Sequence, residues 1–194
     1  MLFRSRAALS PGESIAVFGA GGIGSFIVAA AAHSQPTQLI AVDAGAGRLD
    51  RAASLGATAT LDAGDAAVSA AILERTSGVG ADVVIESSGT VLGLAQAMAS
   101  VRPGGRLVLV GIQARPAEID LARMVVRETD LLTSNGHVGA CDMRSALDLL
   151  ATTELAQRVL GPSTTLHQFV VDGLEPMAAG QLSGKVVVEM RERT

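Results

Sequence analysis

The stretch VFGAGGIG, residues 17–24, decides the expected fold, because it places a Gly-x-Gly-x-x-Gly pattern at the junction of two apolar runs. Residues 14–18 form a short apolar run, which predicts a buried strand. Residues 22–34 are rich in alanine and stop before Pro36, which predicts a helix. A strand before the glycines and a helix after them are the context that a phosphate-binding turn requires.

Each glycine of this turn would have a separate physical role. Gly19 allows the sharp turn out of the strand, Gly21 lets a pyrophosphate approach the backbone, and Gly24 lets the helix pack close to the strand. The start of the helix would offer free N–H groups and a partial positive charge to the phosphates. A tight turn that binds no ligand is the alternative interpretation of the same glycines.

An acidic residue follows the second predicted strand, residues 38–42. Asp43 lies 19 residues after Gly24, a spacing at which a carboxylate can accept hydrogen bonds from the adenosine ribose of a dinucleotide. Its negative charge would repel the 2′-phosphate of NADP, so the sequence predicts NAD. A solvated carboxylate at a strand end is the alternative.

The rest of the chain alternates short apolar runs with longer helical runs. Further strands are predicted over residues 57–61, 82–85, 106–110 and 131–134, and further helices over 48–55, 65–76, 91–101, 117–126 and 142–151. Apolar runs of this length between helices indicate strands that are buried on both faces, as in a parallel sheet. We therefore predict an α/β fold of the Rossmann type, a doubly wound parallel sheet with helices on both faces.

Ligands of such sheets bind outside the carboxyl ends of the strands. Ser88 follows the fourth predicted strand, and Gly111 and Ile112 follow the fifth. Small residues there would leave room for a flat ring, although ordinary loop chemistry explains them equally well. The expected division of the chain is an N-terminal connecting segment (1–11), an NAD-binding domain (12–135) and a C-terminal extension (136–194) that would pack on a further domain and not on the main sheet.

The composition excludes several classes of protein. A hydrophobic fraction of 48 % with a net charge of −4 excludes disorder, and the absence of a basic excess argues against nucleic acid as a partner. The uncharged stretch 14–42 is interrupted by glycines and by residues 33–36, so we expect no membrane span and a cytoplasmic location. Cys141 is the only cysteine, which permits no intrachain disulfide and, with three histidines, no four-ligand zinc site.

Several motifs together resemble the zinc-type medium-chain dehydrogenases, which include alcohol, sorbitol, threonine and butanediol dehydrogenases. The motifs are Ser10-Pro11-Gly12-Glu13, residues 17–24, Ala41-Val42-Asp43 with Arg48, Leu55-Gly56-Ala57, residues 80–86 with Gly89, residues 103–111, and the C-terminal residues 172–175 and 184–186. The resemblance covers about residues 9–190 and is specific to the superfamily, not to one substrate.

The resemblance implies a role for each site residue. The pyrophosphate would be held by Gly19, Gly21, Gly22, Ile23 and Gly24. The adenosine ribose would be bound by Asp43 and Arg48. The nicotinamide would lie beside Val110, Gly111 and Ile112, near a stretch at residues 134–137 that matches the same side of the family's site.

Members of this family have about 350 residues, a length typical of two domains. Their N-terminal half is a barrel-like domain with the catalytic zinc ligands and a proton relay. The 194 residues contain no match to that half, so we expect neither a catalytic residue nor a zinc ion in this chain. The leading hypothesis is the NAD(H)-binding portion of an alcohol or polyol dehydrogenase, which moves hydride between an alcohol or ketone substrate and NAD and is inactive by itself.

Two other functions fit part of the pattern. One is a non-enzymatic NAD-binding module that regulates a partner. The other is an S-adenosylmethionine-dependent methyltransferase, which shares a glycine-rich first turn and an acidic end of the second strand. Short-chain dehydrogenase chemistry is excluded because the chain contains no tyrosine. The family resemblance also implies a homodimer formed by pairing of sheet edges, with residues 131–134 as the candidate edge strand.

Overall fold

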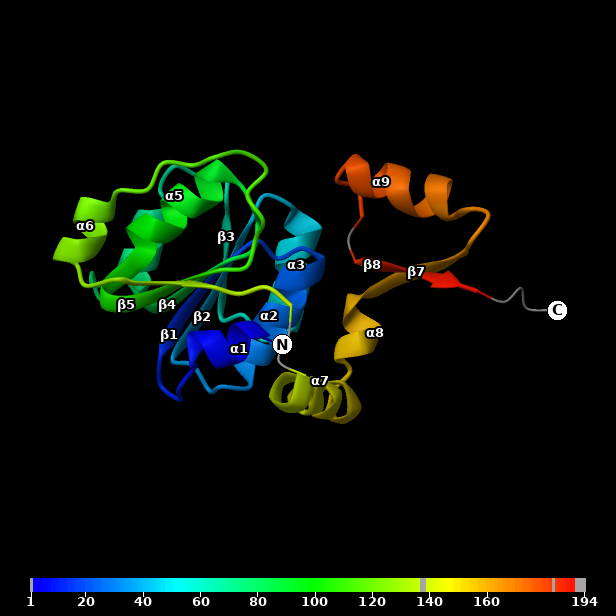
Figure 1. Ribbon diagram of the computed structural model, residues 1–194, viewed down its shortest axis with the longest axis horizontal. Coiled ribbons are helices and arrows are strands. Elements are labelled where there is room, and N and C mark those ends of the chain that lie inside the picture. Colours follow the sequence, from blue (N-terminus) through cyan, green and yellow to red (C-terminus); the bar gives the residue numbers. More distant parts are fainter. Residues whose placement is uncertain (1, 137–138, 183, 191–194) are drawn as a thin grey trace.

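The computed structural model describes residues 2–136, 139–182 and 184–190. A six-stranded sheet with helices on both faces forms the main body, and a smaller two-stranded sheet lies apart from it (Figure 1). The strands of the large sheet are β1 (Ser14–Phe18), β2 (Gln38–Asp43), β3 (Ala59–Asp62), β4 (Ala81–Glu86), β5 (Val101–Leu109) and β6 (Asp130–Thr133).

The strand order of the large sheet is β3-β2-β1-β4-β5-β6, and every neighbouring pair is parallel. The predicted Rossmann-type fold is thereby confirmed. The winding direction reverses between β1 and β4, so a crevice is expected outside the carboxyl ends of these two strands. The predicted edge strand is also confirmed in its position, because β6 ends the sheet on one side.

Helices cover both faces of the large sheet, and the last helix in the chain lies beside the small sheet instead (Figure 1). The helices are α1 (Leu2–Ala7), α2 (Gly22–Ala32), α3 (Ala46–Ser54), α4 (Val68–Arg75), α5 (Val91–Ser100), α6 (Leu121–Val126), α7 (Gly139–Thr152), α8 (Leu155–Val159) and α9 (Glu175–Ala178). Ile15 and Val17 of β1 lie in one core with side chains of α2 and α3. Ala16 and Phe18 lie in the other core with side chains of α4 and α5. Because successive side chains of a strand point to opposite faces, β1 is buried on both.

The segments outside residues 12–135 also pack on the main body. Phe3 and Ala7 of α1 join the same core as α2, and so do Leu155 and Val159 of α8. Beyond α8 the chain forms β7 (Leu160–Thr165), a π-helical turn (Val170–Leu174), α9 and β8 (Lys185–Glu189). β7 and β8 pair in parallel as the separate small sheet.

Several predicted boundaries differ from those of the structure, and two of these differences have a clear local reason. The helix predicted to include Val101 ends at Ser100, because β5 begins at Val101 and pairs with Ala81 before a register shift in the ladder. The helix predicted from residue 117 begins only at Leu121. The Asp120 carboxylate accepts a hydrogen bond from the N–H of Arg123 at 2.9 Å, which is the contact of a residue that caps a helix start.

The uncharged stretch 14–42 is accounted for by the main sheet. It folds as β1, α2 and β2, and α2 has 11 residues. No helix in the described ranges is long and apolar enough to cross a membrane.

Candidate functional site

The glycine turn lies between β1 and α2, and its geometry fits the three predicted roles. Gly19 has φ +90°, a backbone conformation that side chains with a Cβ rarely adopt. A Cβ added at Gly24 would lie 1.8 Å from the carbonyl oxygen of Gly19, so only glycine allows α2 to approach the strand this closely. A Cβ added at Gly21 would meet nothing within 4 Å, so the space above this residue is open to a ligand.

The N-terminus of α2 adjoins that open space. Gly21 is the capping residue, and it has no side chain to accept a hydrogen bond from the first helical N–H groups. Gly22 and Ile23 begin the helix, and the Ile23 side chain is 55 % exposed. The turn therefore presents donors and the positive end of a helix dipole to any anion that enters.

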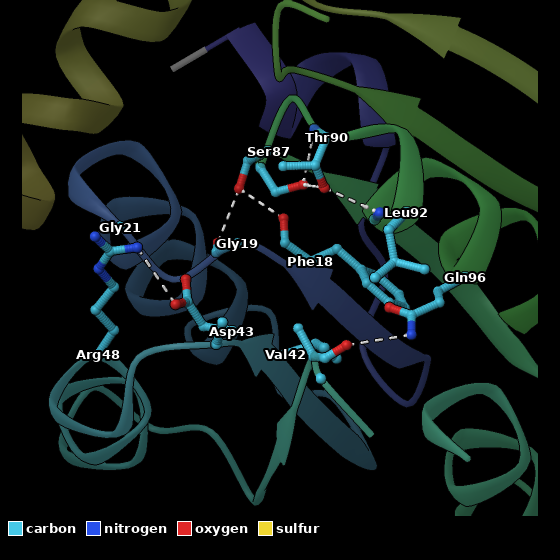
Figure 2. Close-up of a pocket in the computed structure, with 15 residues that line it drawn as sticks. Phe18, Gly19, Gly21, Val42, Asp43, Arg48, Ser87, Thr90, Leu92 and Gln96 are labelled. Carbon is cyan, nitrogen blue, oxygen red and sulfur yellow. Dashed lines mark hydrogen bonds and ion pairs between the residues drawn. The ribbon is translucent and has the colours of Figure 1, made fainter. Parts of the chain in front are cut away.

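Asp43 ends β2 beside this turn, and only 7 % of it is exposed. Its Oδ2 accepts a hydrogen bond from the N–H of Ala20 at 2.7 Å, and its Oδ1 accepts one from the N–H of Gly45 at 2.9 Å. The guanidinium of Arg48 lies 3.4 Å from Oδ1 (Figure 2). A carboxylate has about four acceptor positions, so Asp43 can still accept a hydrogen bond from a ligand hydroxyl.

A cavity of about 500 Å³ extends from the turn along the carboxyl edge of the sheet. Asp43 and Arg48 lie on one side of it, and Ser87, Thr90 and Gln96 lie on the other (Figure 2). This volume lies within the range of about 300–1,000 Å³ that is usual for ligand sites. Phe18, Val42 and Leu92 make much of its lining apolar, which suits a flat aromatic base.

A second cavity of about 380 Å³ lies on the other side of Ser87 and Ser88, which border both cavities. Of the predicted residues, Ser88, Val110, Gly111, Ile112 and Ile23 line it, together with Phe3, Ile27, Ser87, Gly89 and residues 134–136. The structure thus brings the residues predicted for the two ends of a dinucleotide to two adjoining cavities.

Cationic side chains gather on the side of the site formed by α3 and the C-terminal segment. Arg48 also donates a hydrogen bond to the carbonyl oxygen of Gly180 at 3.3 Å. Burial, with a further contribution from nearby Arg48, lowers the pKa of Arg51, and the charge of Asp43 opposes this shift. Of these two arginines, Arg48 lines the cavity, where it is paired with Asp43.

Lys185 lies beside the glycine turn, a position that the sequence did not reveal. It begins β8, and its Cγ lies 3.5 Å from the position that a Cβ of Gly22 would take. The side chain therefore lies over the start of α2, although more than 160 residues separate the two in the chain. Its being the only lysine was the one available signal, and no local motif connects it to the glycine turn.

Metal ligands do not converge in the described part of the chain, where no three His, Cys, Asp or Glu side chains form a group that could hold a metal ion. His137 and the side chain of Cys141 lie outside the described residues.

Comparison with known proteins agrees with this architecture. The profile described as zinc-binding dehydrogenase matches residues 22–152. L-threonine 3-dehydrogenase of Bacillus subtilis (strain 168) is 34 % identical over 184 residues, which are 91 % of this chain and 51 % of that protein.

Solved structures show the same likeness. The 2R,3R-butanediol dehydrogenase from Bacillus subtilis superposes with a TM-score of 0.85 at 28 % identity, covering 98 % of this chain and 54 % of that one. The alcohol dehydrogenase TADH from Thermus sp. ATN1 superposes with a TM-score of 0.87 at 29 % identity, and the match covers 97 % of this chain and 54 % of that one.

The chain belongs to the zinc-binding dehydrogenase family. It spans about half the length of the relatives it matches.

Proposed function

We propose that this chain binds NAD(H) as the cofactor-binding part of an alcohol or polyol dehydrogenase. The observation that carries the proposal is the position of Asp43 beside the open glycine turn. Its carboxylate is anchored by the N–H groups of Ala20 and Gly45 and keeps acceptor capacity toward a cavity of dinucleotide-compatible size. The family relationship supports an oxidoreductase in which the full protein acts on an alcohol or ketone.

The residues would hold the cofactor in three places. The N–H groups at the start of α2, with Lys185 above them, would neutralise the pyrophosphate. Asp43 would accept hydrogen bonds from the adenosine ribose, with Arg48 at the same edge. The nicotinamide would lie in the second cavity, beside Val110, Gly111 and Ile112. When bound, NAD supplies the hydride acceptor at its nicotinamide ring.

A fluorescence titration tests the proposal. The chain has no tryptophan, so emission of the reduced nicotinamide can be followed without interference. We expect saturable binding of NADH, weaker binding of NADPH, and a narrower difference between the two in Asp43→Asn, which removes the charge at nearly constant shape. A folded chain that binds neither cofactor would refute the proposal, and displacement of NADH by S-adenosylmethionine would favour a methyltransferase site.

We also propose that two copies associate through β6. This strand ends the sheet, and an unpaired edge can hydrogen-bond to a second edge. Leu131 on this strand is 37 % exposed. Sedimentation equilibrium is expected to show a dimer that Leu131→Pro dissociates, because the N–H of Ser134 faces β5, so the N–H of Leu131 faces the open edge and proline removes that donor. A wild-type chain that stays monomeric at high concentration would contradict this arrangement.

A further inference from the structure

Glu86, the last residue of β4, carries a carboxylate that the proposed function does not use. It is 0 % exposed. Its Oε1 accepts hydrogen bonds from the N–H of Ser88 at 2.8 Å, from the N–H of Gly89 at 3.0 Å and from the Ser88 hydroxyl. Its Oε2 accepts one from Nε2 of Gln113 at 3.2 Å.

These partners are all donors, and none is a cation. In the described ranges no Arg, Lys or His forms an ion pair with Glu86. A buried carboxylate without hydrogen-bond donors would be strongly unfavourable, so the complete donor set is what permits it to lie here. The donors in turn depend on it, because a buried N–H group that loses its acceptor is itself destabilising.

The same residue links two segments that follow neighbouring strands. Ser88 and Gly89 follow β4, whereas Gln113 follows β5. The carbonyl oxygen of Glu86 adds two more connections, since it accepts hydrogen bonds from the N–H groups of Val110 at 2.8 Å and Gly111 at 2.9 Å.

The packing around the carboxylate leaves little room for movement. A Cβ added at Gly111 would lie 2.7 Å from Oε2, and one added at Gly93 would lie 3.3 Å from Oε1. Gly93 is in the first turn of α5, so the carboxylate also lies at the positive end of that helix. The Glu86 carboxylate thus packs tightly between the start of α5 and the turn after β5.

Ser88 and Gly89, which the carboxylate holds, form part of the wall of the site. Ser88 borders both cavities, and Gly89, Gly111 and Ile112 border only the second. Glu86 itself lines neither cavity. Any effect that it has on a ligand must therefore pass through the segments it holds.

We propose that Glu86 is a positioning residue that fixes the wall between the two cavities and so shapes the nicotinamide side of the site. This inference rests on the proposed binding of NAD(H). Six of the twelve residues that line the second cavity follow β4 and β5, and Ser88 and Gly89 among them are held by the Glu86 carboxylate, whereas the first cavity keeps Asp43, Arg48 and the glycine turn without it. Loss of the carboxylate should weaken NADH binding much more than binding of ADP-ribose, which lacks the nicotinamide.

The decisive variants are Glu86→Ala and Glu86→Gln. Alanine removes both carboxylate oxygens and keeps the backbone carbonyl that Val110 and Gly111 use. Glutamine keeps Oε1, and its new amide can donate to Oε1 of Gln113, which is buried without a hydrogen-bond partner among the described residues. We expect Glu86→Ala to lower NADH affinity about tenfold or more and ADP-ribose affinity less than threefold. We expect Glu86→Gln to stay within about threefold of wild type for both. Glu74→Ala, on the exposed side of α4, is the matched control.

Amide hydrogen exchange of the cofactor-free chain tests separately whether the carboxylate holds the segment after β4. The amides of Ser88 and Gly89 should exchange faster in Glu86→Ala and at the wild-type rate in Glu86→Gln. If Glu86→Ala does not fold, Gln113→Ala replaces it, because it removes the donor to Oε2 alone and should weaken NADH binding selectively.

The possible results separate the two proposals. Parallel losses of NADH and ADP-ribose affinity, unchanged NADH binding in Glu86→Ala, or equal damage by alanine and glutamine would each overturn the role of Glu86 while leaving cofactor binding in place. Failure of the wild-type chain to bind NADH would instead refute the proposed function, and with it the inference that depends on it.

Discussion

The carboxylate of Asp43 accepts a hydrogen bond from the N–H of Ala20 at 2.7 Å, which joins the end of β2 to the turn after β1. Both residues are buried, and Ala20 is 0 % exposed. One side chain therefore supports the shape of the glycine turn and faces the cavity where a ribose would lie. Structural and binding effects of this residue have to be separated by experiment.

Replacement of Asp43 by alanine should destabilise the chain even without ligand. The buried N–H of Ala20 would lose its acceptor, which typically lowers the free energy of unfolding by about 1–3 kcal/mol. Urea unfolding of the cofactor-free protein measures this change. Asp43→Asn serves as the comparison, because its amide oxygen can still accept one of the two hydrogen bonds from Ala20 and Gly45. Equal stability of wild type and Asp43→Ala would show that the bond contributes nothing.

Gly21→Ala should impair binding without a loss of stability. The added Cβ meets no atom within 4 Å, so the free energy of unfolding should change by less than about 1 kcal/mol. It would, however, enter the space through which a pyrophosphate must approach, so NADH affinity should fall at least tenfold. Titration and urea unfolding of the same sample check both statements. Undiminished affinity would place the pyrophosphate elsewhere.

Gly24→Ala should show the opposite pattern. A Cβ 1.8 Å from the carbonyl oxygen of Gly19 would force α2 away from β1. We expect the free energy of unfolding to fall by about 3 kcal/mol or more, as it does when a core is severely overpacked. Thermal unfolding followed by circular dichroism measures this loss. If Gly24→Ala unfolded at the same midpoint temperature as the wild type, the close packing would be disproved.

Lys185→Gln should weaken NADH binding about three- to tenfold and make it less sensitive to salt. The side chain lies over the start of α2, where a pyrophosphate would gain from its charge, and screening by ions weakens such an attraction. Titrations at low and high ionic strength test this expectation. Arg75→Gln removes a positive charge at the exposed end of α4 and should change neither quantity. An identical effect of both variants would mean that only net charge matters.

Asp82 should make stability depend on pH below about 4. Burial opposes ionisation, but hydrogen bonds from Ser14 and the ion pair with Arg102, 2.6 Å away, outweigh it and hold the pKa of Asp82 below its ordinary value of 3.8. A lowered pKa in the folded state stabilises the chain above the unfolded pKa, and this stabilisation disappears as the pH falls through the folded pKa.

Urea unfolding of wild type and Asp82→Asn at pH 7 and pH 3 measures that contribution. The variant should be the less stable protein at pH 7, and the difference between the two should shrink at pH 3. A difference that stays constant across this range would mean that the charge of Asp82 does not stabilise the fold.

Much of the architecture could be derived from residues that act locally. The apolar runs around Val17 and Val84 predict buried strands because strand burial leaves a direct mark on short segments of sequence. The roles of Gly19 and Gly24 were also predictable, since a tight turn and a close helix contact each exclude a Cβ. Some boundaries were misplaced, such as Val101, where pairing with a neighbouring strand overrides helix propensity, and the elements α1, α8 and β7 were not predicted.

The sequence by itself therefore determined the α/β fold, the glycine turn and the position of Asp43 at a strand end. Only the tertiary structure brought Lys185 over Gly22 and placed Glu86 among donors from two different turns. The physical reason is the range of the interactions. Periodicity and turn chemistry act over a few neighbouring residues, whereas these contacts form only when strands and helices distant in the chain have packed together.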